Sequence, residues 1–489
     1  MDRMARSGGL NLPQDVSLVG MSPHMEHLQH AFDLQRQNLI VPTADQRRAW
    51  LNKLWATIDS HQEALVDALH KDLGKPREEV LLHEVFPVKN EIRFARKHLR
   101  GWMSPQRTPT PLTMVGTRSC IQHQPKGQVL VIAPWNFPMM LTLRPVVCAL
   151  AAGNSVMVKP SEHAPHTADW IFKIVSEALP AQVATVILGG ADESAFLTSL
   201  PFQHIYFTGG TGIGRKVMHA AADSLASVTL ELGGKSPAIV DSTVHVIDAA
   251  KRLAWGKFLN SGQVCISPDY LLVEDAIADD LVREFLAQTQ SMYGASSESQ
   301  LTCNQRSRIV NDHHFNRVVG LVEDALAKGA RVVAGGTWDA ETRRIAPTVL
   351  EDVTLDMAIM QEEIFGPVLP VIRWSSEKDL KCILDANPHP LAMYFFSKNQ
   401  VTVTRWMRQF PSGTAAVNEV ILQVAQPELP FGGIQASGIG RTGGYAGFQA
   451  FSNPRSVVSQ RSRFNILPLT FPPFTSFTSK LIAAVLRWL

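Results

Sequence analysis

The chain has 489 residues, of which 45% are hydrophobic and 18% are charged, as in soluble globular proteins. This length exceeds what a single core usually supports, so it predicts two or three domains. The 46 basic and 44 acidic residues nearly balance, and no arginine-rich run or acidic tail indicates a nucleic-acid partner.

The placement of cysteine and histidine argues against a disulfide framework and against a metal site. The five cysteines are scattered, without a CxxC pair: Cys120, Cys148, Cys265, Cys303 and Cys382. The 16 histidines include no HxxxH or HExxH pair. Residues 1–20 lack the apolar segment of a secretory signal. We therefore expect a cytoplasmic protein that binds no metal.

The chain up to about residue 100 is predicted to be mainly helical. Apolar side chains recur at helical spacing between residues 44 and 100, most clearly in 50–58 and 64–69. Residues 112–125 alternate only in part and predict a loose strand.

From Gly127 onward, apolar strand-like runs alternate with amphipathic stretches. The runs are 127–133, 154–159, 184–188, 204–207 and 227–232, and the clearest amphipathic stretches are 166–178 and 213–225. Continuous apolar strands that alternate with helices predict a parallel sheet covered on both faces. Such a sheet binds ligands at the carboxyl ends of its strands.

A second α/β series follows Gly233 and Gly234. It comprises predicted helices at 246–259, 277–291, 377–385 and 400–409 and predicted strands at 270–274, 331–334, 367–373, 391–397 and 414–418. A domain boundary at the two glycines would place Glu231 and Cys265 on opposite sides of an interdomain cleft, which is a favoured place for ligands.

Cys265 and Glu231 are the candidate reactive pair. Cys265 lies in a polar, glycine-containing turn (FLNSGQVCISPDY, 258–270), where a thiol can be reached and can ionise. Glu231 ends an apolar strand and enters a glycine turn (VTLELGGKSP, 228–237). A thiol and an acid at the edges of two elements indicate acyl chemistry at sulfur, completed by a base.

Other strand ends carry polar candidates. Asn136 is bracketed by two prolines, so its amide could donate to an oxyanion, although an asparagine that serves only the turn is the simpler interpretation. Lys159 and Glu162 could bind ribose hydroxyls or could be solvated surface charges. The loop FTGGTGIG (207–214) could cradle a phosphate at a helix amino end or could be a tight turn.

The segment QEEIFGP (361–367) places an acid and an aromatic residue before a strand. Glu363 could hold a ribose, and Phe365 could pack on a flat ring. The simpler interpretation is an acidic loop with a buried phenylalanine.

Residues 464–489 form an acid-free tail rich in Phe, Leu and Pro. Its apolar run after Lys480 is far shorter than the ~20 residues of a membrane-spanning helix. Two interpretations stay open. The tail could pack on the body or on a partner subunit, or it could be an interfacial anchor with Lys480, Arg487 and Trp488 at headgroup level.

Taken together, these segments resemble the aldehyde dehydrogenase superfamily over roughly residues 40–460. The family's motifs follow in the family's order: PWNFP (134–138), VKPSE (158–162), FTGGTGIG, LELGGKSP (230–237), GQVC (262–265), EEIFGP (362–367) and LPFGG (429–433). The separation of 34 residues between Glu231 and Cys265 is also that of the family. The continuation CISPDY (265–270) is similar to the class 3 branch, which includes fatty, aromatic and coniferyl aldehyde dehydrogenases.

The resemblance implies an α/β fold with a Rossmann-type parallel-sheet cofactor domain, a second α/β catalytic domain and a small β extension for oligomerisation. Carried onto this sequence, the parts are an NAD(P)-binding domain (1–110 and 126–232), a catalytic domain (233–420), oligomerisation segments (111–125 and 421–463) and the tail (464–489). Many class 3 members are dimers and some carry apolar tails. We therefore expect a homodimer, in which the tail either packs on a subunit or makes peripheral membrane contact.

The resemblance also implies roles for individual residues. Cys265 would be the nucleophile, Glu231 the general base and Asn136 the oxyanion donor. They would oxidise medium- or long-chain aliphatic or aromatic aldehydes to acids through a Cys265 thiohemiacetal and thioester, without a metal. The cofactor, NAD with NADP as the alternative, would be held by Trp135, Lys159, Ser161, Glu162, Gly209, Gly210, Thr211, Gly214, Leu232, Glu363 and Phe365. Glu162 would repel a 2′-phosphate, which favours NAD.

Two departures from the class 3 pattern bear on specificity. Gly210 stands where many relatives have Ser or Asn, and Thr442, Gly443 and Gly444 stand where Tyr-His-Gly is usual. These changes leave the core chemistry intact and the substrate open. The alternatives are a CoA-acylating dehydrogenase, against which Glu231 weighs, a cofactor-free thiol hydrolase, and a non-catalytic membrane-surface or structural member of the family.

Overall fold

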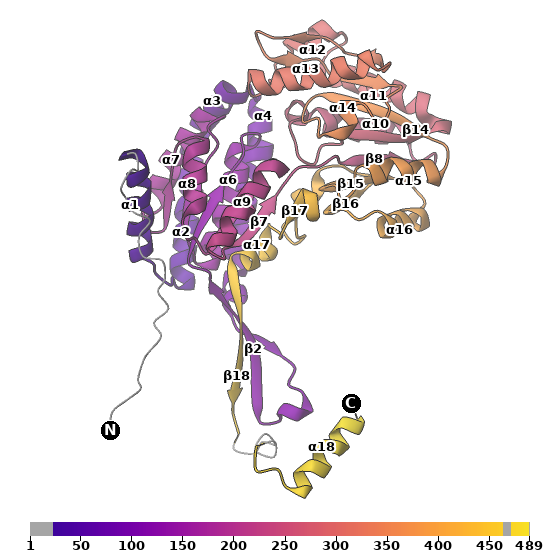
Figure 1. The fold of residues 1–489 in the computed structure, drawn as a ribbon. Coiled ribbons are helices and arrows are strands. Elements are labelled where there is room, and N and C mark those ends of the chain that lie inside the picture. Colours follow the sequence, from indigo (N-terminus) through magenta and orange to yellow (C-terminus); the bar gives the residue numbers. More distant parts are fainter. Residues whose placement is uncertain (1–22, 463–470, 489) are drawn as a thin grey trace.

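The computed structural model describes residues 23–462 and 471–488, which form two α/β lobes and an extension (Figure 1). The first lobe begins with helices α1 (Pro23–Gln37), α2 (Ala44–Ser60), α3 (Gln62–Leu73), α4 (Arg77–Val80), the π-helix η1 (Leu81–Val85) and α5 (Phe86–Met103). A capping box between Thr43 and Gln46 starts α2, and Gly74, with φ 65°, ends α3. The helical prediction for residues 44–100 is confirmed, with a break at 74–76.

A six-stranded sheet forms the centre of the first lobe, in the order β17-β7-β6-β3-β4-β5. Its strands are β3 (Gln128–Ile132), β4 (Ser155–Lys159), β5 (Ala184–Val186), β6 (His204–Thr208), β7 (Ser227–Glu231) and β17 (Gly438–Ile439). Only β17 is antiparallel to its neighbour. The five parallel strands are those that the apolar runs predict.

Helices cover both faces of this sheet. As a result, every residue of β3 and β4 is buried. Besides the helices already named, the covering helices are α6 (Pro138–Ala152), α7 (Pro165–Ala178), α8 (Ala191–Ser199) and α9 (Thr211–Asp223). Val129 and Val131 pack in one apolar cluster with α2, α5, α6 and α7. Leu130 and Ile132 face the other way and pack in a second cluster with α1, α8 and α9.

The second lobe contains a seven-stranded sheet in the order β10-β13-β14-β9-β8-β15-β16, parallel except for β10. The strands are β8 (Pro237–Val240), β9 (Tyr270–Glu274), β10 (Arg331–Ala334), β13 (Thr348–Glu351), β14 (Val368–Trp374), β15 (Ala392–Phe396) and β16 (Thr414–Val417). The helices are α10 (Val246–Phe258), α11 (Ala278–Tyr293), α12 (Ser297–Thr302), α13 (Asp312–Ala327), α14 (Ala358–Gln361), α15 (Glu377–Ala386) and α16 (Gln400–Gln409). A small ribbon joins β11 (Trp338–Asp339) to β12 (Arg344–Ile345).

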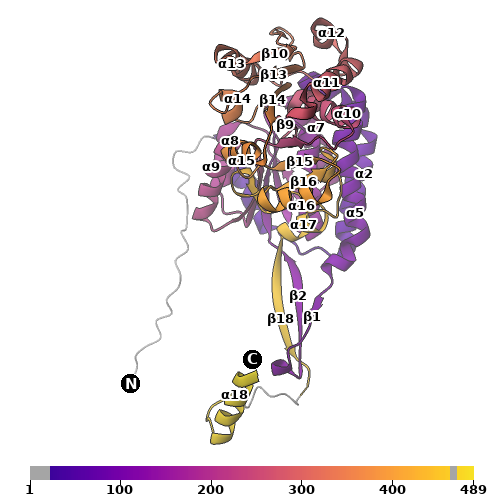
Figure 2. The ribbon, with the colours of Figure 1, turned by 90° about the vertical axis from the view of Figure 1, so that its right-hand side faces the viewer.

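A narrow three-stranded antiparallel sheet projects from the body (Figures 1 and 2). It pairs β1 (Gln106–Thr108) with β2 (Thr117–Pro125), and β2 with β18 (Ser452–Gln460). Helix α17 (Gly444–Ala450) lies at its base. The strand predicted over 112–125 begins only at Thr117, because residues 112–114 form a short 3-10 helix.

The tail ends in helix α18 (Ser476–Trp488), which lies away from both lobes (Figures 1 and 2). No helix among the described residues is long and apolar enough to cross a membrane. The expectations for residues 1–20 and for the start of the tail at 464–470 lie outside the described residues.

Candidate active site

Cys265 lies in a loop whose backbone is tightly constrained. Helix α10 ends at Phe258 and runs into the 3-10 turn η3 (Leu259–Gly262), in which Asn260 and Ser261 have φ 47° and 52°. Gly262 has φ 76°, and a Cβ there would lie 2.2 Å from the carbonyl oxygen of Gly366, so only glycine fits. Three residues later, Cys265 is half-buried.

Glu231 is the last residue of β7 and is 5% exposed. Neither of its carboxylate oxygens has a hydrogen-bond partner among the described residues. Burial raises the pKa of Glu231 well above its ordinary value, and the positive charges of Arg441 and Arg144 oppose that shift. The structure thus holds an unpaired carboxyl whose affinity for a proton is higher than that of an ordinary glutamate, as suits a general base.

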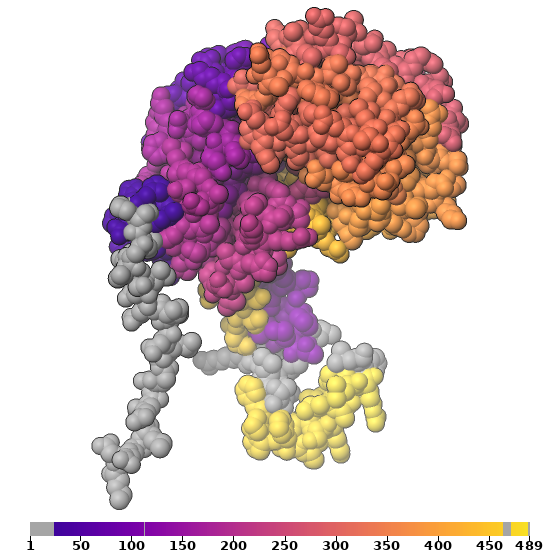
Figure 3. Space-filling model, turned by 45° about the horizontal axis from the view of Figure 1, so that its top comes forward, coloured from indigo at the N-terminus to yellow at the C-terminus, as the bar shows by residue number. Residues whose placement is uncertain are grey.

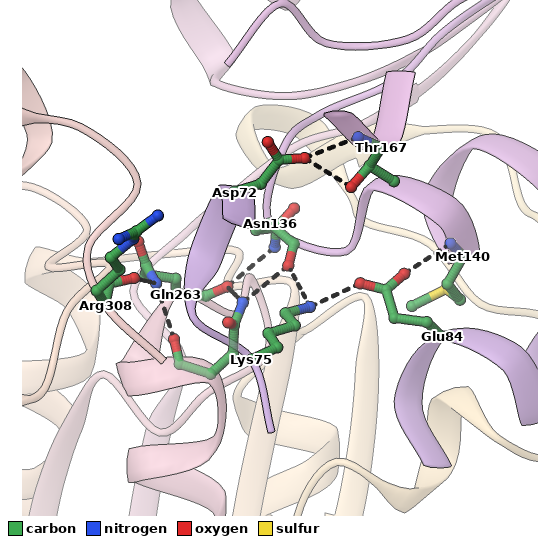
Figure 4. Close-up of polar contacts among 9 residues, drawn as sticks. Asp72, Lys75, Glu84, Asn136, Met140, Thr167, Gln263 and Arg308 are labelled. Atoms are coloured by element: carbon green, nitrogen blue, oxygen red, sulfur yellow. Dashed lines mark hydrogen bonds and ion pairs between the residues drawn. The ribbon is translucent and has the colours of Figure 1, made fainter. Parts of the chain in front are cut away.

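Asn136 lies between β3 and α6, and three hydrogen bonds fix it (Figure 4). Its Nδ2 donates to the carbonyl oxygen of Gln263 (3.0 Å). The backbone carbonyl oxygen of Asn136 accepts hydrogen bonds from Lys75 Nζ and from Asn260 Nδ2, both at 2.8 Å. The second amide hydrogen of Asn136 has no acceptor in the described part of the chain and remains free to donate.

These three residues line one cavity of about 220 Å³ in the hollow between the two lobes (Figure 3). Six of the residues predicted to bind the cofactor line it too: Trp135, Gly209, Gly210, Leu232, Glu363 and Phe365. The Trp135 and Phe365 rings meet edge to face with centroids 5.4 Å apart. The cavity therefore combines aromatic walls, an open glycine turn and the reactive thiol.

The other predicted cofactor residues lie outside the lining of this cavity: Lys159, Ser161, Glu162, Thr211 and Gly214. Lys159 Nζ donates to Glu162 Oε2 (3.0 Å) and to the carbonyl oxygen of Pro160 (2.8 Å). Thr211 donates to the carbonyl oxygen of Ala436 (3.0 Å). Because β4 and β6 both run parallel to β3, Lys159 and the glycine turn lie at the same edge of the sheet.

The residues present fit a dinucleotide. Gly210 precedes the first residue of α9, and a Cβ there would meet nothing within 4 Å, so the backbone is open to a phosphate at a helix amino end. A Cβ on Gly233 would lie 1.9 Å from Glu363 Oε2, so glycine is required for Glu363 to reach the cavity. Glu162 has a 40% exposed side chain anchored by Lys159, as a ribose-binding carboxylate requires.

Burial raises the pKa of the Cys265 thiol, and the nearby carboxyls of Glu363 and Glu231 raise it further. The backbone N–H groups of Cys265 and Ile266 oppose this shift. Burial, together with Asp269, raises the pKa of Glu363 to about 8. The thiol is therefore protonated at neutral pH in this state, and its reaction requires a base or a loss of negative charge nearby.

A smaller cavity of about 30 Å³ lies on the other side of Cys265. The two cavities share five lining residues: Leu141, Thr208, Glu231, Leu232 and Cys265. The remaining wall of the smaller cavity is mainly apolar, from Met140, Pro145, Leu391, Val424 and Phe431. The thiol and the carboxyl thus line both the larger cavity, with its aromatic walls and glycine turn, and the smaller, mainly apolar one.

Two arginines in these cavities were not predicted. Arg144 lines the smaller cavity and pairs with buried Glu91 (3.2 Å). Arg317 donates to the carbonyl oxygens of Glu363 (3.1 Å) and Ile364 (2.6 Å), and so holds the loop that carries Phe365. A sequence signal existed for Arg144, which interrupts the apolar run 138–152. No group of three or more potential metal ligands occurs among residues 23–462 and 471–488.

The sequence is similar to known proteins over most of its length. The sequence model described as "Aldehyde dehydrogenase family" matches residues 30–457. A protein of Pseudomonas aeruginosa named "Probable coniferyl aldehyde dehydrogenase" is 38% identical over 96% of this chain and 98% of its own length. A rat protein named "Aldehyde dehydrogenase, dimeric NADP-preferring" is 38% identical over 83% of this chain and 88% of its own.

The fold is also found in a solved structure. The structure described as "Substrate bound state of Staphylococcus Aureus AldH" has a TM-score of 0.89 and 36% sequence identity. The match covers 94% of this chain and 99% of that one.

Proposed function

The chain belongs to the aldehyde dehydrogenase family and oxidises aldehydes to carboxylic acids with NAD(P), and on this premise we propose that Cys265, Glu231 and Asn136 perform the reaction. One observation carries the proposal. The three residues come from three separate segments of the chain and line one cavity between the lobes. A thiol, an unpaired carboxyl and a fixed amide donor are the groups that acyl transfer through sulfur requires.

The Cys265 thiol gives its proton to solvent water and attacks the aldehyde carbon as a thiolate, so that the carbonyl oxygen becomes an oxyanion. The free amide hydrogen of Asn136 and the backbone N–H of Cys265 donate to that oxyanion. Bound NAD(P) would supply the hydride acceptor that converts the Cys265 adduct into a thioester. Trp135, Gly209, Gly210, Leu232, Glu363 and Phe365 would hold the nicotinamide end, and Lys159, Ser161, Glu162, Thr211 and Gly214 the adenosine end.

Glu231 then acts as the general base that releases the acid. Its unpaired carboxylate takes a proton from water, the hydroxide attacks the thioester carbon, and the Cys265 thiolate leaves. A carboxylate without hydrogen-bond partners, in a buried position, is a stronger base than one in water. The same residue weighs against release by CoA, because a base next to the thioester favours water.

The test is the increase in reduced-nicotinamide absorbance with short, long-chain, benzaldehyde-like and cinnamaldehyde-like substrates. The wild type should turn over, whereas Cys265→Ala should fall to background. Cys382→Ala is the matched control, because Cys382 is an exposed cysteine on α15 and should keep full activity. Turnover that survives Cys265→Ala would refute the assignment of the nucleophile.

The substrate class follows from the apolar wall of the smaller cavity. We propose that medium- or long-chain aliphatic or aromatic aldehydes are preferred, because this wall offers dispersion contacts and few polar groups. The name of the Pseudomonas relative supports an aromatic aldehyde. The panel should therefore rank short aldehydes last in kcat/KM, and a short aldehyde in first place would contradict this proposal.

For the cofactor, we propose that NAD is preferred over NADP. The pKa of Glu162 is affected in opposite directions: partial burial raises it, whereas its hydrogen bonds and Lys159 lower it below the ordinary value, so the group is anionic at neutral pH. An anionic carboxylate accepts hydrogen bonds from a 2′-hydroxyl and repels a 2′-phosphate. A higher kcat/KM with NADP would refute this preference.

We further propose a homodimer, with residues 1–110 and 126–232 as the NAD(P)-binding domain, 233–420 as the catalytic domain, and 111–125 with 421–463 as the subunit contact. The edge strand β18 has nine residues and, among the described strands, pairs with β2 alone, so its outer edge can pair with a second chain. The tail would add peripheral membrane contact. The name of the rat relative supports a dimer.

A further inference from the structure

A buried ion pair lies directly beneath Asn136 (Figure 4). Lys75 follows the left-handed Gly74 that ends α3, and its side chain is fully buried. Its Nζ donates to Glu84 Oε1 (2.6 Å) and to the carbonyl oxygen of Asn136 (2.8 Å). The ammonium also lies 4.0 Å from the centroid of the Phe137 ring. Lys75 therefore contacts two consecutive residues at the start of α6.

Glu84 contacts the first turn of α6, just beyond the residues that Lys75 contacts. It lies in the π-helix η1, a rare form that is frequent at functional sites. Its side chain is fully buried, and its Oε2 accepts from the backbone N–H of Met140 (2.9 Å). The ion pair thus spans residues 136–140, with Lys75 bonded to the carbonyl of Asn136 and Glu84 bonded to the amide of Met140.

A contact from the second lobe completes this arrangement. Asn260, at φ 47° in the loop before Cys265, donates through Nδ2 to the same carbonyl of Asn136 (2.8 Å). Asn136 in turn donates to the carbonyl of Gln263 (3.0 Å). Gln263 is itself fixed, because its Nε2 donates to Arg308 O (3.1 Å) and its Oε1 accepts from Val310 N (3.1 Å). Residues of both lobes therefore hold the oxyanion donor Asn136. One of them, Gln263, lies two residues before the nucleophile in the sequence.

We propose that the Lys75–Glu84 ion pair and Asn260 are positioning residues, which fix Asn136 so that its free amide hydrogen points at the oxyanion formed on Cys265. The inference rests on the proposed function and adds to it a set of residues that never touch the substrate. A buried ion pair is costly to form and is a weak source of stability, so its place beneath the oxyanion donor indicates a geometric role. A displacement of about 1 Å in such a donor can slow a reaction ~10²-fold.

The central experiment is a double-mutant cycle between Lys75→Met and Asn136→Ala. We expect Lys75→Met to lower kcat and the rate of the first-turnover burst ~10–100-fold, with KM for NAD within about 3-fold, because the donor moves and the cofactor site does not. In the Asn136→Ala background, Lys75→Met should cost nothing further. An equal loss of kcat in both backgrounds, or no loss in either, would overturn the proposal.

Asn260→Asp is the second variant, since it keeps side-chain size and tolerates the left-handed backbone while replacing the Nδ2 donor with an acceptor. It should show the same kcat loss and the same non-additivity with Asn136→Ala. It keeps the proposal testable even if Lys75→Met does not fold.

Arg47→Met is the matched control for a buried cation. Arg47 is 3% exposed and donates to two backbone carbonyls, of Pro42 (3.1 Å) and Ala151 (2.8 Å), but it lines neither cavity at Cys265. It should lower the melting temperature and leave kcat unchanged. If Arg47→Met lowers kcat as much as Lys75→Met, the effect is general destabilisation and the inference fails. If the wild type oxidises no aldehyde, the proposed function fails first.

Discussion

Glu231 owes its basicity to burial, and two arginines limit how far its pKa rises. Arg441 is the stronger influence, followed by Arg144. A Cβ on Gly432 would lie 3.1 Å from both Glu231 Oε1 and Arg441 Cδ, so the acid and the arginine flank the same glycine. Arg441 itself donates to the carbonyl oxygens of Gly433 and Gly440, both at 2.7 Å. This geometry makes Arg441 a means of tuning the base.

Arg441→Met should therefore shift the pH dependence of turnover. A general base works only when deprotonated, so kcat rises with pH through the pKa of Glu231. Loss of the Arg441 charge raises that pKa further, and the acid limb of the kcat profile should move to higher pH. The measurement is kcat against pH from 5 to 10 with a saturating aldehyde.

Two controls interpret that profile. Glu231→Gln should remove the acid limb that belongs to the base and leave a first-turnover burst followed by slow turnover. Arg408→Met removes an exposed arginine from α16 and should not move the profile. A profile of Arg441→Met that is unshifted, or shifted to lower pH, would show that Arg441 does not act on the base.

At the level of single residues, the sequence identified the groups that react but not the groups that hold them. Cys265, Glu231 and Asn136 stand in turns at strand and helix ends, where a polar residue is conspicuous. Lys75 lies in the break after α3 and Glu84 in η1, both within the stretch predicted to be helical, where a charge is expected to face solvent. Lys75 contacts Asn136, 61 residues further along the chain, and Glu84 contacts Met140, and no local pattern reveals such contacts.

At the level of elements, strands β3, β4 and β6 were predictable because each is mainly apolar and buried at every position. Strand β7 was predictable from a shorter signal, since only its last three residues are buried. Strand β8 was not predicted, since it is only four residues long (Pro237–Val240) and follows closely on the glycine turn at 233–234. Strand β18 was also not predicted, because its sequence is largely polar and most of it is exposed. It exists through pairing with β2, more than 300 residues earlier in the chain.

The 3-10 turn η3 shows how an element positions the nucleophile, and Gly262 is its tightest point. Gly262→Ala adds a Cβ 2.2 Å from the Gly366 carbonyl at φ 76°. We expect it to lower the free energy of unfolding by about 1–3 kcal/mol and to reduce turnover, because the loop before Cys265 must move. Urea denaturation followed by circular dichroism measures the stability change.

Gly320→Ala is the control for Gly262→Ala. Gly320 is exposed in the middle of α13, and a Cβ there meets nothing within 4 Å. Alanine favours the helix, so this variant should be more stable by about 0.5–1 kcal/mol. An unchanged stability and turnover for Gly262→Ala would show that the turn adapts easily.

At the level of the whole molecule, strands β1, β2 and β18 and the described part of the tail contribute no residue to the two cavities at Cys265. Helix α18 and the residues before it expose seven large apolar side chains: Phe471, Phe474, Phe477, Leu481, Ile482, Val485 and Leu486. This segment has two cations, Lys480 and Arg487, and no acid. An apolar helix with basic residues favours the surface of an anionic membrane.

Ending the chain after Arg463 tests this division of roles. The catalytic groups all precede the cut. We therefore expect kcat and KM for a water-soluble aldehyde to stay within about 2-fold of the full chain's values, because neither constant depends on contacts made far from the active site. Binding to vesicles of anionic phospholipid, measured by sedimentation, should fall to the level of neutral vesicles. If vesicle binding is unchanged but the mass by light scattering halves, the tail packs on the partner subunit instead. If neither changes, both interpretations of the tail are wrong, and the exposed apolar face of α18 has some other role.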